Sequence, residues 1–262
     1  MADRQNFDAK KESAVPEVAK RRITAAVVDD TVQPKLDETL YLQLKTAALN
    51  PDATACRRAV KASLAKGTSP EELADVYIPA IARDMGDRWC EDQLSFASVT
   101  IGVSRLQAMM RELGPNWASD NAAAPGAPSI LLIVLQDVYH TLGAIVLTSQ
   151  LRRKGFSVKL LLGCRSEDIA ERIQRTKYHS VFISSSRGET LESLRRIVDV
   201  VKNSTDRSPP VVVGGTILDV ETINDVTALT GADYATKIPD EALEYCGLQD
   251  IPHNIAHAKN GT

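Results

Sequence analysis

The feature that most constrains this chain is an unbroken apolar run at its centre, Ile130–Leu135. Six consecutive apolar residues are typical of a strand buried on both faces inside a parallel sheet. A short polar segment follows, and a helical pattern then runs from Leu142 to a C-terminal cap at Gly155. We therefore expect His140 at the carboxyl end of a central strand, where open α/β sheets bind their ligands.

The C-terminal half continues this alternation of strands and helices. Further strands are predicted at 157–162, 181–184, 211–214 and near Tyr234, and helices at 142–154, 166–176, 190–203 and 219–229. Regular alternation predicts a doubly wound, parallel α/β sheet with right-handed crossovers, the flavodoxin-like class.

The N-terminal half has a helical pattern from Leu36 to Leu113. Ser69-Pro70-Glu71-Glu72 forms a capping box with proline at the first helical position, which is a strong helix start. Four amphipathic helices predict an all-α bundle before the α/β domain. The predicted parts are a mobile tail (1–35), the four-helix bundle (36–115), a linker (116–128), the α/β domain (129–250) and a C-terminal tail (251–262).

Composition excludes several classes of protein. A net charge of −3 argues against nucleic acid as the main partner. No segment has the roughly 18–20 apolar residues needed to span a bilayer, and the N-terminus lacks the apolar core of a secretory signal. The four cysteines form no C-x-x-C pair, so we expect buried, reduced thiols and no structural zinc site in a cytoplasmic protein: Cys56, Cys90, Cys164 and Cys246.

Three short motifs follow three of the predicted strands. They are His140-x-x-Gly143, the serines at 184–186, and Gly214-Gly215. Each alone has an ordinary explanation as a loop histidine or a tight turn. In this order they resemble the vitamin B12-binding fold, whose pattern is D-x-H-x-x-G, S-x-L and G-G. Val138 occupies the acidic position here, with Asp137 one residue earlier, and Ser186 occupies the leucine position.

The resemblance implies a cobalamin site at the carboxyl ends of the strands. His140 would be the lower cobalt ligand, with the cofactor's own base displaced, and Asp137 or a backbone carbonyl would orient the imidazole. Glycines would leave room for the cofactor, and hydroxyl groups would meet the polar atoms of its buried tail. The expected cofactor-binding residues are His140, Asp137, Thr141, Leu142, Gly143, Ser184, Ser186, Gly214, Gly215 and Thr216, with Trp89 and Val99 from the helical part.

Gly86-x-x-Trp89 resembles the helical domain that covers the corrin ring in light sensors of the CarH/LitR type. Trp89 would then cap a flat ligand, although core packing explains most tryptophans. Those sensors carry a Glu-His pair where this chain has Val99 and Thr100, and no histidine precedes His140. The upper cobalt face would therefore hold water, an adenosyl or methyl group, or an exposed Cys90, though a packed thiol is expected there. The remaining histidines are read as a surface residue, His179, and a weak terminal metal pair, His253 and His257.

The stretch Trp89–Gln107 is similar to the AerR/PpaA family of photosynthesis-gene antirepressors. This resemblance implies a light-responsive regulator that binds adenosyl-, methyl- or hydroxocobalamin and is not an enzyme. It would contact a PpsR/CrtJ-type repressor, and DNA only indirectly. Three alternatives stay open: a corrinoid carrier subunit of a methyltransferase, a haem-binding sensor, and a nucleotide-binding enzyme. The last lacks a glycine-rich phosphate loop after the first strand.

Overall fold

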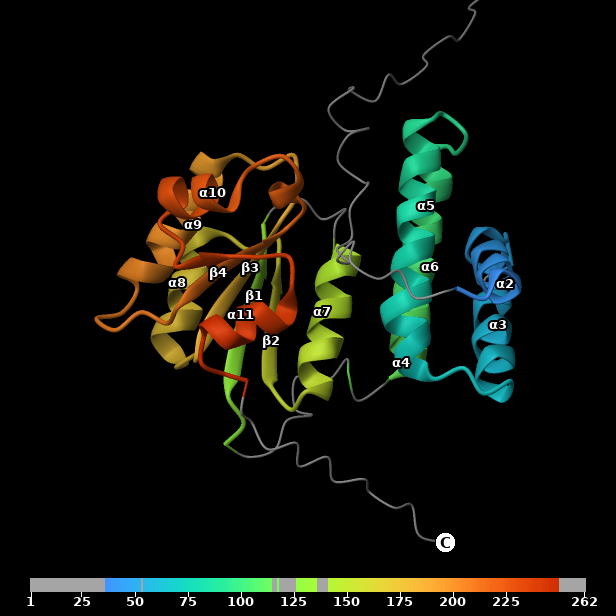
Figure 1. Ribbon diagram of the computed structural model, residues 1–262, viewed down its shortest axis with the longest axis horizontal. Helices are drawn as coiled ribbons and strands as arrows, with labels where there is room; N and C mark the ends of the chain where they lie inside the picture. The colour runs from blue at the N-terminus through green and yellow to red at the C-terminus, as the bar shows by residue number, and fades with distance from the viewer. Residues whose placement is uncertain (1–35, 53, 115–116, 118–125, 136–140, 250–262) are drawn as a thin grey trace, which may run out of the picture.

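The C-terminal part of the molecule is built on a five-stranded parallel sheet with the order β2-β1-β3-β4-β5. The structure is a computed structural model that describes residues 36–52, 54–114, 117, 126–135 and 141–249 (Figure 1). The strands are β1 (Ser129–Val134), β2 (Ser157–Leu162), β3 (Ser180–Ser185), β4 (Val211–Gly215) and β5 (Tyr234–Ala235). The predicted flavodoxin-like sheet is confirmed, and its order reverses between β1 and β3, where such sheets bind ligands.

Both faces of the sheet are covered by helices. One face packs against α7 (Thr141–Arg153) and α11 (Pro239–Tyr245), and the other against α8 (Ser166–Arg175), α9 (Leu191–Asn203) and α10 (Ile223–Thr230). The central strand serves both layers, because Leu131 and Ile133 pack toward α8 and α9 while Leu132 and Val134 pack toward α7 and α11. This two-sided burial is why β1 has no polar residue between its ends.

Two details of this part differ from the prediction. The helix expected at 219–229 begins only at Ile223, because Thr216–Asp219 forms a 3-10 turn (η3) and the Thr222 side chain caps α10. Helix α11 was not predicted. Its sequence signal is Pro239 at the first helical position, followed by Asp240 and Glu241 in the first turn.

The N-terminal part is helical throughout its described residues. It contains α2 (Glu38–Leu49), α3 (Thr54–Ala65), a long helix made of α4 (Pro70–Glu72), the π-helical turn η1 (Leu73–Tyr77) and α5 (Ile78–Cys90), and finally α6 (Phe96–Leu113). The predicted start of the long helix is confirmed, since Ser69 Oγ accepts a hydrogen bond from the Glu72 N–H at 3.0 Å. The π turn was not predicted; there the Ile78 N–H bonds back to the Leu73 carbonyl.

Helix α7 is shared between the sheet and the helical part. Figure 1 shows it standing between the strands and the α5–α6 pair. Leu142 and Val146 belong to the core of the helical part, whereas Ala144 and Leu151 belong to the core of the sheet. The two parts therefore pack through the opposite faces of a single helix.

Polar contacts fasten both ends of α7 to the helical part. At its first turn, Gln107 Nε2 donates to Thr141 Oγ1 at 2.8 Å. At its last turn, Arg153 pairs with Asp75 of η1 at 2.5 Å, and its guanidinium lies 4.4 Å from the ring centre of Trp117. The π turn thus carries the carboxylate that holds the end of α7.

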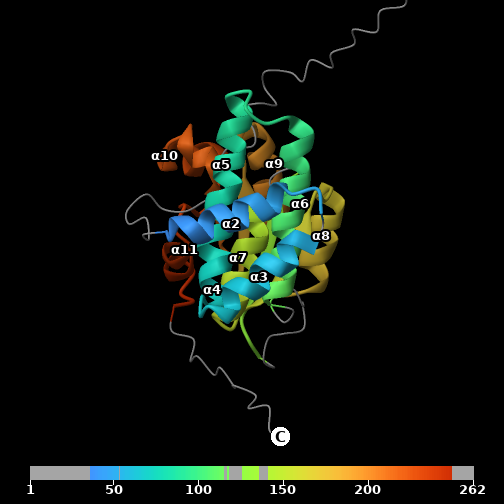
Figure 2. The same ribbon diagram turned by 90° about the vertical axis from the view of Figure 1, so that its right-hand side faces the viewer.

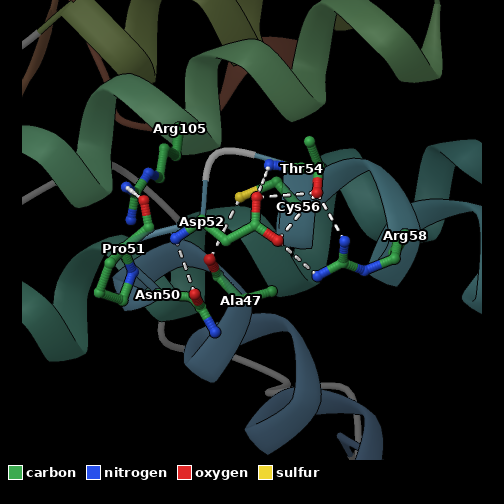
Figure 3. A network of polar contacts seen from close by, with 8 residues as sticks. All are labelled: Ala47, Asn50, Pro51, Asp52, Thr54, Cys56, Arg58 and Arg105. Atoms are coloured by element: carbon green, nitrogen blue, oxygen red, sulfur yellow. Dashed lines mark hydrogen bonds and ion pairs between the residues drawn. The ribbon is translucent and has the colours of Figure 1, made fainter.

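Helices α2 and α3 lie across α5 and α6 on the side away from the sheet (Figure 2). Their connection is fixed by a polar network (Figure 3). Asp52 accepts from the Thr54 N–H at 2.8 Å and pairs with Arg58 at 2.7 Å. Arg105 of α6 donates to the carbonyl of Pro51 at 3.1 Å (Figure 3). It also donates to the carbonyl of Ala48 at 3.1 Å. The bond to Ala48 satisfies a carbonyl group that the end of α2 leaves unpaired.

None of the four cysteines is in a disulfide, and not all are buried. Cys56 is buried and donates to the Ala47 carbonyl at 3.3 Å, Cys164 and Cys246 are partly exposed, and Cys90 is exposed. The expectation of a packed thiol at Cys90 is therefore wrong, because this residue ends α5 where the chain turns toward α6. No helix among the described residues has the length and apolar character required to cross a membrane.

Candidate functional site

The carboxyl edge of the sheet brings together two residues predicted for the site. The parallel register places Ser184 of β3 between Val134 of β1 and Gly214 of β4. Phe182, two residues before Ser184, packs toward α7 and α11. Since strand residues two apart share a face, Ser184 and Gly214 also face α7 and α11.

Both glycines at the end of β4 are required by the backbone around them. Gly215 has φ +99°, and a Cβ added there would lie 2.3 Å from the Ser185 carbonyl oxygen. A Cβ on Gly214 would lie 2.8 Å from the Thr236 carbonyl oxygen. The tip of β4 therefore touches both neighbouring strands so closely that glycine is needed even without a ligand.

The turn after β3 contains a buried hydroxyl that none of the described residues pairs with. Glu189 accepts hydrogen bonds from Ser185 Oγ and, at 3.1 Å, from the Ser186 N–H. Ser186 itself is only 6% exposed, and among the described residues its Oγ has no hydrogen-bond partner. A buried unpaired hydroxyl costs about 1–3 kcal/mol, so a ligand that supplied a polar group here would recover this energy.

Charged side chains that the sequence analysis missed lie beside this turn. Arg187 donates through Nε and Nη2 to Asp219 Oδ2 at 2.9 and 2.6 Å, and Lys237 bonds to Asp219 Oδ1. Burial acts to raise the pKa of Asp219, but hydrogen bonds from Lys237 and Arg187 outweigh it and the net shift is downward. Thr216, a predicted site residue, is buried and accepts from the Arg187 N–H at 3.2 Å. The sequence signal that could have identified Arg187, Asp219 and Lys237 is their position, because each follows the end of one of three adjacent strands.

The predicted residues from the helical part lie in its core. Trp89 is 3% exposed, with its ring 5.9 Å from that of Phe96, and Val99 is 1% exposed. Thr141 and Leu142 face the helical part as well, through the bond to Gln107 and through core packing. The structure thus places these four side chains on the bundle side of α7 and not among Ser184, Ser186 and Gly214.

Of the four histidines, only His179 lies among the described residues. His140 and Asp137 lie outside the described residues, as do His253 and His257. His179 is exposed, and its Nδ1 accepts from the Ser129 N–H at 3.0 Å, at the start of β1 and away from the site. Gly143 is partly exposed in the first turn of α7. Within the described part of the chain, no three His, Cys, Asp or Glu side chains are grouped to hold a metal ion.

The end of α5 is electrostatically linked to the edge of the sheet. Burial raises the pKa of Asp87, and the carboxylates of Asp84 and Glu91 raise it further. The guanidinium of Arg187 acts in the opposite direction on the same carboxyl group. Because Arg187 follows β3, the last turns of α5 lie within electrostatic reach of the carboxyl edge.

Comparisons with known proteins show which family and fold this chain resembles. The family described as B12 binding domain matches residues 128–244. A curated relative from Rhodobacter capsulatus, "Uncharacterized 20.5 kDa protein in bchF-crtJ intergenic region", is 32% identical over 166 residues, which are 63% of this chain and 85% of the relative. The solved monomethylamine corrinoid protein of Methanosarcina barkeri shares the fold, with a TM-score of 0.58 and 15% identity over 82% of this chain and all of that one.

The described residues fit a cobalamin-type cofactor. Ser184 and Gly214 stand side by side at the sheet's switch point, and the buried Ser186 hydroxyl lacks a partner in the described part of the chain. Such an edge suits a ligand that presents polar atoms to it. With the family match and the curated relative, these features show that the chain belongs to the B12-binding family, in the AerR/PpaA-type group that its sequence resembles.

Proposed function

We propose that this protein is a cobalamin-binding, light-responsive transcriptional regulator that is not an enzyme. It would act by contact with a PpsR/CrtJ-type repressor and would influence DNA only through that protein. The observation that carries the proposal is the relative's position between bchF and crtJ, together with the B12 binding domain that matches residues 128–244 of this chain.

In this proposal the chain's own residues hold the cofactor at the carboxyl edge. His140 would hold cobalt, and the displaced base would be buried beside Ser184 and Gly214, where the hydroxyl groups of Ser184 and Ser186 would meet its polar atoms. When bound, the cofactor would supply a light-sensitive bond to cobalt. The group that light removes or exchanges there would be water, an adenosyl or methyl group, or the exposed thiol of Cys90, which ends α5.

The route from the site to the repressor would run through the helical part. Asp87 and Arg187 link α5 to the edge of the sheet, and α7 shares its two faces between both cores. Light shifts the protein between two conformations only if the dark and illuminated cofactor differ in affinity for them. The conformation with lower repressor affinity would involve a changed contact of α5 with the edge.

The proposal is tested by the visible spectrum of the protein mixed with cobalamin, in the dark and after illumination. The wild type should bind cobalamin with its base displaced and should change its spectrum on illumination. His140→Ala should lose the displaced-base spectrum, whereas the control His179→Ala, altered at the opposite edge of the sheet, should behave as the wild type.

Three results would contradict the proposal. If the wild type and His140→Ala gave the same spectrum with cobalamin, His140 would not be a cobalt ligand. A Soret band in the protein as purified, with no bound corrinoid, would assign a haem sensor. Robust methyl turnover with a partner methyltransferase, and no effect of light on repressor binding, would assign a corrinoid carrier.

A further inference from the structure

Two cations at the carboxyl edge share a single carboxylate. Arg187 follows β3 and Lys237 follows β5, and both bond to Asp219, which follows β4. The cationic side chains are each 38% exposed, while Asp219 is 18% exposed. The carboxylate is thus the inner member of the cluster, and the cations present donors outward.

These cations retain unused hydrogen-bond donors. Arg187 uses Nε and Nη2 for Asp219, and among the described residues its Nη1 makes no hydrogen bond. Lys237 uses one of three N–H donors. Glu189, the carboxylate of the turn after β3, accepts hydrogen bonds from Ser185 Oγ and the Ser186 N–H. An incoming anion would therefore find donors that no described residue occupies.

The neighbouring Ser186 gives independent support for a ligand at this place. Ser186 directly precedes Arg187 in the sequence. Its hydroxyl is buried and has no partner in the described part of the chain. Asp87 of α5 also lies within electrostatic reach of Arg187, but burial and its acidic neighbours raise its pKa.

We propose that Arg187, Lys237 and Ser186 form a binding site for the phosphodiester of the cofactor's nucleotide loop. The loop joins the corrin ring to the base that is buried beside Ser184 and Gly214, so its phosphodiester must pass the adjacent edge. One negative charge matches two cations that share one carboxylate, and the fork of an arginine suits phosphate oxygens. This proposal rests on cobalamin binding and assigns the residues that recognise the nucleotide part.

The test compares cobalamin with cobinamide, a corrinoid that lacks the phosphodiester and base. Dissociation constants are measured by absorption titration for the wild type, Arg187→Gln, Lys237→Gln and Ser186→Ala. Arg187→Gln should weaken cobalamin binding about tenfold, the effect of one charge-assisted hydrogen bond. Cobinamide binding should change less than about twofold, because cobinamide lacks the phosphodiester that Arg187 would contact. The advantage of cobalamin over cobinamide should shrink as salt is added to the wild type.

Matched controls separate this role from a structural one. Arg165→Gln removes another arginine that pairs with an aspartate, Asp168, but after β2 at the far edge of the sheet, and should leave both ligands unaffected. Ser186→Ala should weaken cobalamin binding without lowering the melting temperature of the free protein, because the lost hydroxyl has no partner among the residues that the structure describes. Inorganic phosphate should compete with cobalamin in the wild type and less in Arg187→Gln.

Three outcomes would overturn the assignment. Equal weakening of cobalamin and cobinamide would mean that Arg187 acts only by holding the edge together. Unchanged cobalamin affinity in all three variants would show that Arg187, Lys237 and Ser186 do not bind the cofactor. Phosphate binding without competition against cobalamin would assign a site for free phosphate. If the wild type binds neither corrinoid, the proposed function itself fails, which is a distinguishable result.

Discussion

Replacing Gly215 with alanine tests whether the tip of β4 depends on contact between backbones. Two separate costs apply. The first is the backbone at φ +99° and ψ −168°, a region essentially restricted to glycine, which costs another residue about 1–3 kcal/mol. The second is the overlap of the new Cβ with the Ser185 backbone, 2.3 Å from its oxygen and 2.9 Å from its nitrogen. Neither atom belongs to a flexible side chain, so relief requires β3 and β4 to separate, which costs about 3 kcal/mol.

Gly155→Ala is a matched control for the first cost alone. Gly155 has φ +91°, and an added Cβ would meet nothing within 4 Å among the described residues. It should therefore lose about 1–2 kcal/mol. Gly215→Ala should lose at least about 2 kcal/mol more than this control.

The free energy of unfolding is measured by urea denaturation of both variants and the wild type. The denaturant slopes must agree, so that differences in midpoint report stability. Equal losses for the two variants would refute the reasoning, because they would show that the β3 backbone does not resist the added methyl group. The same preparation of Gly215→Ala should also bind cobalamin less tightly, since Ser184 and Ser186 flank the displaced strand.

Three further predictions concern the helical part. Arg153→Met should lower the free energy of unfolding by about 2 kcal/mol, because the pair with Asp75 is largely buried; a double-mutant cycle with Asp75→Asn showing no coupling would contradict it. Arg105→Gln should cost about 1–2 kcal/mol by unpairing two carbonyls, and faster hydrogen exchange confined to α2 and α3 would locate the effect. Hydrogen bonds from the Thr54 N–H and from Arg58 lower the pKa of Asp52 from 3.8 to about 2, so ionised Asp52 stabilises the fold above pH 3.8 and less as pH falls toward 2. Thermal melts of wild type and Asp52→Asn should converge over that interval, and a constant difference would contradict the assignment.

Sequence reasoning succeeded where one short segment carries the whole signal. The run at Ile130–Leu135 predicts a buried strand because an apolar residue at every position suits only a strand covered on both faces. Ser69 marks the start of the long helix because its capping bond joins residues three apart. The motifs at His140, Ser184 and Gly214 identified the family for the same local reason, since each is a short run of sequence that is recognised without its neighbours in space.

Tertiary structure decided what depends on partners distant in the chain. Asp75 and Arg153 are 78 positions apart, and no periodicity indicates that α7 lies between two cores. The cluster of Arg187, Asp219 and Lys237 exists only because the order β3-β4-β5 brings three turns to one edge. Exposure of Cys90 and burial of Trp89, adjacent in sequence, follow from which side of α5 meets α6. Sequence alone thus determined the strands, the cap and the family, whereas the residues that surround a ligand were decided by the packing of elements, because such contacts are properties of the assembled sheet edge.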